Sequence, residues 1–203
     1  MKKLFVTFAL ATAAVGAFAQ GSLTYQSTLG VGKEKYIFKP DPSAPTVAKN
    51  GGALADYAAF SKVDGTGYTA ELYWAAGEGA AEGSLKAVAG SQVSFRTGAT
   101  AGLINGKAKL DIAGTLGGDK VTLQLRVWNN QGGTVTSWDQ AIEKGKSNLF
   151  THELAGVDGS GSPKLGTGSI ANGLTYFSLT VPEPSVVALG ALGLGALLLR
   201  RRK

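Results

Sequence analysis

The chain has 203 residues, of which 30 are glycine and none is cysteine. The lack of cysteine excludes disulfides, thiolate metal sites and cysteine nucleophiles. The length suits one ordinary domain with processing segments at its ends, and a core of that size can form without disulfides.

The formal net charge of +6 comes from the two ends of the chain. Lys2, Lys3 and the run 200–203 supply six of the 20 cations, whereas only one of the 14 acids, Glu183, lies outside residues 20–181. The body therefore carries fourteen cations against thirteen acids. Proteins that bind nucleic acid usually have a basic stripe, so we expect no nucleic-acid partner.

Residues 1–19 have the three parts of a secretory signal peptide in the required order. Two lysines come first, an apolar run follows over residues 4–15, and a small-x-small cleavage site closes the segment. A buried N-terminal helix would not need this order. We therefore expect signal peptidase to remove the segment and the rest of the chain to be exported. The residues of the predicted cleavage site are Ala17, Ala19 and Gln20.

After the signal peptide, short runs of Val, Leu, Thr, Tyr and Phe alternate with glycine-rich turns, as in all-β domains. The clearest strands are 68–74 and 121–128, in which apolar and polar residues alternate. Such alternation places one face on a core and the other in water, which is usual in antiparallel sheets. Weaker strands are predicted at 23–28, 35–38, 84–88, 92–96, 107–112, 148–154 and 174–181. This pattern predicts an antiparallel two-sheet sandwich or jelly roll over residues 20–181.

Helix signals are few. The segment 137–145 predicts one short helix with Gly145 just past its end, and residues 53–60 predict another turn or two. Asn-Gly and Asp-Gly pairs, such as Asn105-Gly106 and Asp158-Gly159, predict tight turns between the strands.

Few residues of the body suggest catalysis or metal binding. We interpret the single histidine, His152, as a strand residue with its ring at the surface, and a zinc protease would need a second histidine where Gly156 stands. A serine–histidine arrangement formed only in the fold stays an alternative, as does a pair of carboxylates for glycoside hydrolysis. For Asp64 and Asp158 we favour turns over calcium sites, because calcium needs several converging oxygen ligands. We predict no catalytic residue, no metal and no cofactor.

Two tryptophans are the only hint of ligand recognition in the body. Trp128 falls on the polar side of its predicted strand, and Trp138 follows ten residues later. Exposed tryptophans can stack on sugar rings, so a carbohydrate-binding surface is one interpretation. The other is that a tryptophan at a strand end covers the edge of the core.

The C-terminal tail, residues 182–203, combines a Pro-Glu-Pro triplet, a run of apolar or small residues over 185–199, and four cations. As a helix the run would be about 22 Å long, which is short against a hydrocarbon core of about 30 Å. It could still span if the cations reached the headgroups, and they would then lie on the cytoplasmic side. A soluble core helix would not be apolar on all sides and end in four charges.

These three parts, in this order, closely resemble the PEP-CTERM sorting signal of Gram-negative bacteria. The resemblance implies that Pro182, Glu183 and Pro184 are recognised by an exosortase, a membrane-embedded cysteine protease that removes the tail. It also implies transient inner-membrane anchorage, with Arg200, Arg201, Arg202 and Lys203 fixing orientation, and final sorting to the cell surface or extracellular polymeric material. The body resembles a loosely defined group of exported proteins through its strands 68–73 and 121–128 and the segment 95–97.

The sequence therefore predicts an exported, non-enzymatic protein of the cell surface or extracellular matrix. A carbohydrate-binding module for exopolysaccharide is the first alternative, with Trp128 and Trp138 as stacking residues. A secreted hydrolase is the second.

Overall fold

The computed structural model describes residues 20–182, and this part of the chain is all-β, with short 3-10 helices in its loops. Within that range no helix has the length and apolar character needed to cross a bilayer. The predictions for the signal peptide, for Glu183 and Pro184, for the apolar run and for residues 200–203 lie outside the described residues.

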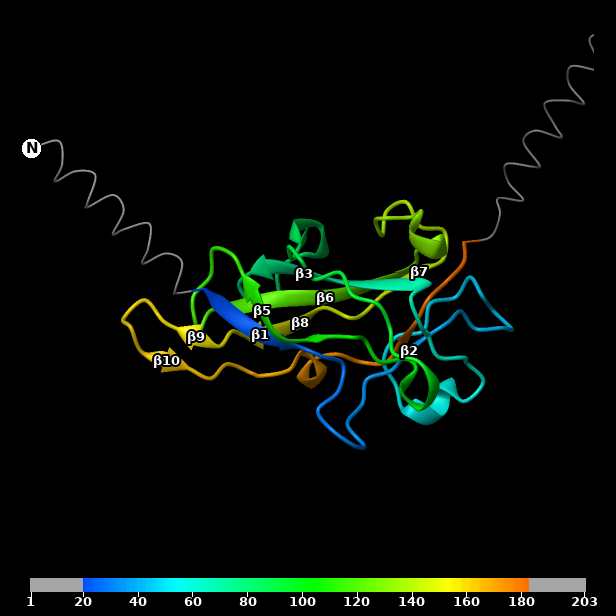
Figure 1. Ribbon diagram of the computed structural model, residues 1–203, viewed down its shortest axis with the longest axis horizontal. Helices are drawn as coiled ribbons and strands as arrows, with labels where there is room; N and C mark the ends of the chain where they lie inside the picture. Colours follow the sequence, from blue (N-terminus) through cyan, green and yellow to red (C-terminus); the bar gives the residue numbers. More distant parts are fainter. Residues whose placement is uncertain (1–19, 183–203) are drawn as a thin grey trace, which may run out of the picture.

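A five-stranded sheet forms the centre of the molecule (Figure 1). Its two long strands, β3 (Tyr68–Ala76) and β6 (Lys120–Asn129), pair antiparallel over their full common length. The short strand β4 (Lys86–Ala87) pairs with the free side of β3. The free side of β6 is shared by β7 (Lys144–Lys146) and β8 (Phe150–Glu153), which bind successive halves of that strand.

Three smaller pairs complete the strand inventory of residues 20–182. β1 (Gly21–Tyr25) and β5 (Lys107–Ile112) are antiparallel, as are β9 (Gly156–Val157) and β10 (Pro163–Lys164), whereas β2 (Ile37–Phe38) and β11 (Phe177–Ser178) are parallel. The 3-10 helices are η1 (Leu54–Tyr57), η2 (Glu82–Ser84), η3 (Gly98–Thr100), η4 (Gln131–Gly133) and η5 (Ile170–Asn172).

The hydrophobic core takes side chains from the central sheet and from the smaller pairs. The apolar face predicted for β6 is confirmed, because its four members are fully buried in one cluster with residues of β1, β2, β5 and β11. Those four residues are Val121, Leu123, Leu125 and Val127. Burial of this apolar surface is the main source of stability that a chain without disulfides can have.

The opposite face of β6 differs from the prediction. Thr122 and Gln124 were expected in water, yet they are only 1% and 2% exposed. The loop after β3 folds over this face, where the Thr122 hydroxyl accepts a hydrogen bond from the Ala80 amide at 2.9 Å and donates one to the Gly77 carbonyl at 2.8 Å. The central sheet is therefore covered on both faces at this point.

Two local predictions are wrong. Residues 137–145 form turns that lead into β7 instead of a helix, because Lys144 and Gly145 pair with the edge of β6. Residues 92–96 form no strand of their own and make only single bridges through Val93 and Phe95. The predicted turn or two at residues 53–60 is confirmed by η1.

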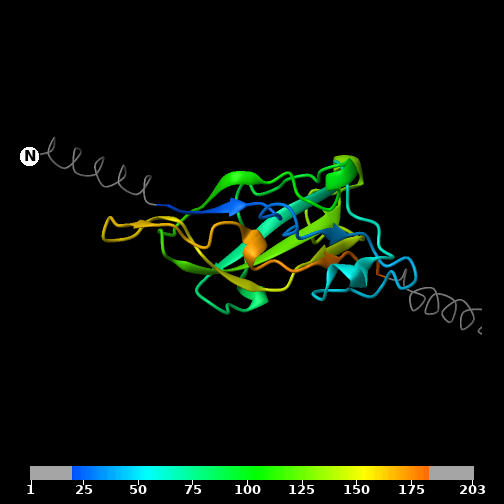
Figure 2. The same cartoon turned by 90° about the horizontal axis from the view of Figure 1, so that it is seen from below.

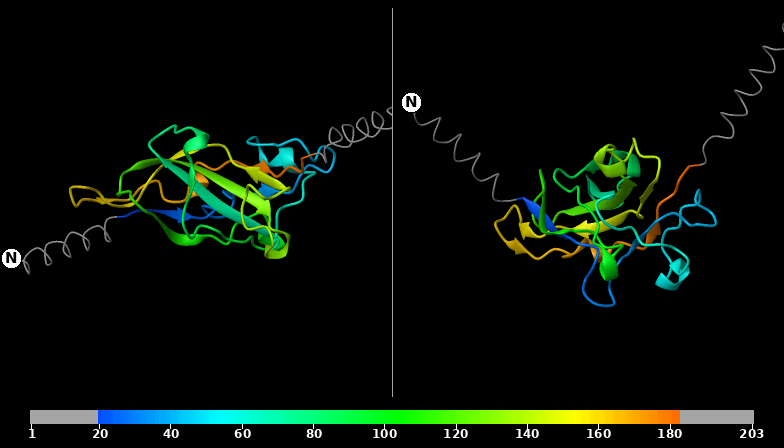
Figure 3. Two further views of the ribbon diagram at one scale, coloured as in Figure 1. Left: turned by 90° about the horizontal axis from the view of Figure 1, so that it is seen from above. Right: turned by 45° about the vertical axis from the view of Figure 1, so that its right-hand side comes forward.

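The described chain starts and ends at opposite ends of the long axis (Figures 1 and 2). Near its end, Thr180 pairs with Lys144, and the Val181 amide donates to the Pro45 carbonyl at 2.8 Å. Pro182, the last described residue, is exposed. We call the point where the described chain ends the exit. Figure 3 shows the exit beside the segment that leads from β2 to β3.

Candidate functional site

Trp128 is part of the protein interior, which corrects its assignment as a stacking residue. Its side chain is 0% exposed, and its indole Nε1 donates to the Val135 carbonyl at 3.1 Å. The loop after β6 folds back over the ring, because the Asn130 side chain accepts from the Gly133 amide at 3.2 Å and donates to the Thr66 carbonyl at 2.8 Å. A sugar ring cannot reach a tryptophan that is covered in this way.

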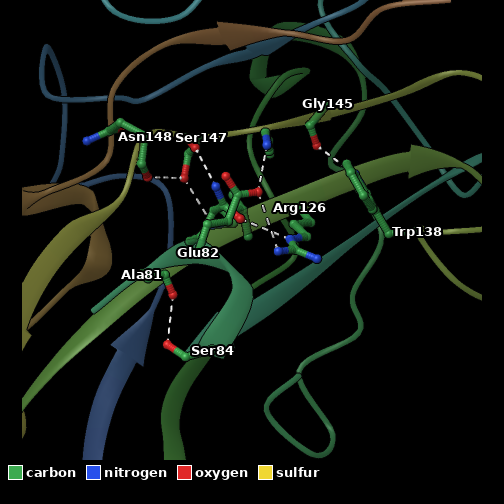
Figure 4. A network of polar contacts seen from close by, with 11 residues as sticks. Ala81, Glu82, Ser84, Arg126, Trp138, Gly145, Ser147 and Asn148 are labelled. Carbon is green, nitrogen blue, oxygen red and sulfur yellow. Dashed lines mark hydrogen bonds and ion pairs between the residues drawn. The ribbon is translucent and has the colours of Figure 1, made fainter. Parts of the chain in front are cut away.

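Trp138 is partly exposed and lies over the outer face of the central sheet, which is the face opposite the core that carries Thr122 and Gln124 (Figure 4). Its Nε1 donates to the Gly145 carbonyl at 3.1 Å, which fixes one edge of the ring to β7. Two cations contact the ring: Lys144 Nζ lies 4.4 Å and Arg126 Cζ 4.9 Å from its centroid. Such cation–π contacts hold the ring in place and cover part of its face.

Arg126 is the centre of the polar cluster on this face. Its side chain is only 12% exposed, and its guanidinium carbon also lies 4.1 Å from the ring centroid of Tyr73. The Nε atom donates to Gln124 Oε1 at 2.9 Å, and Nη2 lies 3.6 Å from Glu82 Oε1. Packing against two aromatic rings and bonding to two polar side chains holds the arginine rigidly.

Glu82, from η2, ties a loop to the sheet. Its carboxylate pairs with Lys146 Nζ at 2.6 Å as well as with Arg126. The hydrogen bond from Lys146 is the main cause that lowers the pKa of Glu82, and the nearby charges of Lys146 and Arg126 add to it. Figure 4 shows Glu82 beside Arg126. On the same strand as Arg126, Gln124 Nε2 donates to the Ser147 carbonyl at 3.2 Å. Glu82 is thus ionised and held in two ion pairs.

We call the side chains of Tyr73, Glu82, Arg126, Trp138 and Lys146 the outer-face cluster. Its carboxylate is engaged by two cations, and the Nε atom of its arginine is bonded to Gln124. Among residues 20–182, no three or more His, Cys, Asp or Glu side chains form a group that could hold a metal ion. The cluster offers partly exposed aromatic and cationic surface, which is chemistry for binding.

His152 lies in the core, not at the surface as predicted. It is 1% exposed, it pairs across the sheet with Val121 of the core face, and neither ring nitrogen has a hydrogen-bond partner in the protein. Desolvation by burial is the main cause that lowers the pKa of His152. A buried imidazole of this kind has no access to a substrate.

The turn interpretation of the two aspartates is confirmed. Asp158 Oδ1 accepts from the Ser160 amide at 2.9 Å, the Ser160 hydroxyl at 2.7 Å and the Ser162 amide at 2.8 Å. Hydrogen bonding to Ser160 is the main cause that lowers the pKa of Asp158 well below its usual range. Asp64 forms an ion pair with Lys39 at 2.9 Å. Asp158 is therefore engaged by neighbours in its own turn, and Asp64 by a lysine from a separate segment.

The structure brings together residues that the sequence does not single out. Tyr73, Glu82 and Arg126 meet although 44 residues separate Glu82 from Arg126 in the chain. The one signal in the sequence was Arg126, a charged residue on the polar face of the predicted strand 121–128. Gln20 and Pro182, of the two predicted processing sites, are exposed.

Comparisons with family models, with curated proteins and with solved structures find no match for this chain.

Proposed function

We propose that this chain is an exported, non-enzymatic protein of the cell surface or extracellular matrix. Its leader would be removed by signal peptidase, and its C-terminal tail would hold it transiently in the inner membrane until an exosortase processes it. The observation that carries the proposal is the order of the tail's parts: Pro182-Glu183-Pro184, an apolar run over 185–199, and four terminal cations. We further propose that the all-β body is an antiparallel two-sheet sandwich.

The end of the body supports this proposal. Main-chain pairing continues through Thr180 and Val181, and Pro182 is exposed directly after the last hydrogen bond. Cleavage in the Pro-Glu-Pro region would therefore break no hydrogen bond among the described residues. Two prolines also favour an extended backbone without internal hydrogen bonds, which is what a protease cleft accepts.

The non-enzymatic part rests on the state of the polar side chains in residues 20–182. Glu82 is held in ion pairs, Asp158 is bonded within its turn, and His152 is buried without a polar partner. A general acid or base needs a group that can exchange protons with a bound substrate. These three groups do not meet that requirement, which makes a secreted hydrolase the weakest of the candidate functions.

The tail can be tested by changing Pro182 and Pro184 together to alanine in the native host. Processing should stop, so the mature protein should keep residues 185–203 and stay in the membrane fraction, as intact mass spectrometry and fractionation would show. Changing the exposed Pro42 to alanine is the matched control and should leave processing normal. Normal removal of the tail from the double variant would refute the sorting hypothesis.

A carbohydrate-binding module for exopolysaccharide is the second candidate, favoured by the partly exposed Trp138 and the two cations, Arg126 and Lys144, over its ring. Trp128 no longer contributes to it. A glycan array or polysaccharide pull-down with residues 20–182, repeated with Trp138→Ala, tests this candidate. Binding that is lost in the variant would support it, and an equally inert pair of proteins would exclude it.

A further inference from the structure

Four aromatic side chains gather at the end of the molecule where the described chain leaves the body. Tyr57 stacks on Phe38 with ring centroids 4.5 Å apart, and it lies 5.2 Å from Phe60 and 6.0 Å from Tyr176. Phe38 and Tyr57 are buried, whereas Phe60 and Tyr176 are partly exposed. The segment 39–62 and the exit at Val181 lie at the same end of the long axis in both views (Figures 1 and 2).

Two lysines extend this aromatic group toward solvent. Lys49 Nζ lies 5.0 Å from the ring centroid of Tyr57 and 5.5 Å from that of Phe60, and Lys35 Nζ lies 5.2 Å from that of Tyr176. Neither lysine belongs to an ion pair within residues 20–182. We call Lys35, Phe38, Lys49, Tyr57, Phe60 and Tyr176 the exit cluster.

Charge is distributed unevenly between the two ends of the molecule. Residues 33–62, around the exit cluster, contain five lysines against three acids. The hairpin of β9 and β10 at the opposite end has one acid, Asp158, and one lysine, Lys164, and these two form an ion pair (Figure 1). A negatively charged surface would therefore attract the exit end more strongly than the other end.

Exposed apolar side chains stand next to the exit. Val47 is 60% and Leu54 is 44% exposed. Val47 is two residues from Pro45, whose carbonyl binds the Val181 amide. Apolar side chains that flank aromatic rings and lysines are typical of surfaces that rest in the headgroup layer of a membrane.

The length of chain between the body and the apolar run sets the distance to the membrane. Two residues separate Pro182 from Ser185, where the run starts, and the three Cα–Cα steps between them reach at most about 10 Å when fully extended. The headgroup layer on one side of a bilayer is itself roughly 5–8 Å thick. A body on so short a tether must touch the headgroups with the surface around Val181.

We propose that the exit cluster, with Val47 and Leu54, is a docking surface for an anionic lipid bilayer while the tail is anchored. This inference rests on the proposed function, because the apolar run must enter the membrane. The lysines would contact lipid phosphates, and the partly exposed Phe60 and Tyr176, with Val47 and Leu54, would lie at the level of the headgroups. The buried Phe38 and Tyr57 would support these side chains from the interior. The contact orients the body on the membrane and so presents the Pro-Glu-Pro region at a fixed height for processing.

The test uses the full chain reconstituted into phosphatidylcholine vesicles that contain phosphatidylglycerol. Because the chain has no cysteine, single labels can be placed with Val47→Cys, Leu54→Cys and, as the matched control at the other end, Leu165→Cys, which replaces a side chain that is 92% exposed. Each carries an environment-sensitive fluorophore, and spin-labelled lipids with the label near the headgroup serve as quenchers.

We expect quenching and a blue shift for the labels at 47 and 54, and neither for the label at 165. Changing Lys35 and Lys49 together to glutamate should lower the quenching at position 47 by roughly half, because each lysine contributes to attraction by anionic lipid. Near-ultraviolet circular dichroism of that variant confirms that it is folded. Labels at 47 and 54 that stay as water-exposed as the label at 165 would overturn the proposal.

A fourth label shows whether a negative result refutes the docking surface or the proposed membrane anchorage of the tail. Leu192→Cys reports on the apolar run itself, and deep-lying spin-labelled lipids should quench it. If position 192 is quenched while positions 47 and 54 are not, the anchor stands and the docking surface is refuted. If position 192 is not quenched, the anchorage in the proposed function fails. A shift at position 47 caused by soluble alginate but not by vesicles would overturn the lipid assignment in favour of a glycan.

Discussion

Changing Trp128 to phenylalanine tests the burial on which the revised assignment of this residue depends. The smaller ring removes the equivalent of two or three buried methylene groups, or about 2 kcal/mol of transfer free energy. It also removes the donor that binds the Val135 carbonyl at 3.1 Å, for roughly another 1 kcal/mol. The free energy of unfolding should therefore fall by about 3 kcal/mol.

Trp138→Phe is the matched control, because that indole also donates to a backbone carbonyl at 3.1 Å but is partly exposed. Its cost should stay near 1 kcal/mol. Urea unfolding of residues 20–182, followed by circular dichroism, measures both. With a slope of about 2 kcal/mol per molar urea, the Trp128 variant should lose roughly 1.5 M in midpoint and the control about 0.5 M. Equal losses would refute the argument from burial.

Three further predictions concern the interior, the outer face and a strand contact. Burial lowers the pKa of His152, so the stability that its neutral form contributes should be complete above the pKa of the unfolded chain, near 6.5, and be lost as the pH falls below it. His152→Leu should therefore make the urea midpoint less dependent on pH between about pH 5 and 7. An unchanged dependence of the midpoint on pH would contradict this. Arg126→Met should cost about 1–2 kcal/mol and speed proteolysis of the loop at 77–85, whereas Lys109→Met, at an exposed ion pair, should change neither measurably. Gly106→Ala would place Cβ against the Tyr25 carbonyl oxygen, so its midpoint should fall by an amount that corresponds to about 3 kcal/mol, while Gly67→Ala, with open space, should cost far less.

The sequence by itself determined the β-rich class, the two long strands and the side of β6 that faces the core. Local alternation is sufficient for this, because neighbouring residues of a strand point to opposite faces whatever the rest of the chain does. The same local pattern could not say what covers the other face. Thr122 and Gln124 read as solvent-exposed, and they are buried because the loop at 77–85 binds over them.

Only the tertiary structure decided the position of the three residues first considered for function. Trp128 is enclosed by the loop after its own strand, and His152 is enclosed by the core on which β8 packs. Trp138 is held by Arg126 and by the Gly145 carbonyl. Each of these contacts joins segments that pack together only in the folded chain, so the residue types alone do not reveal them. The processing signals proposed for the two ends stay predictions from sequence, which rest on residue order and length and not on packing.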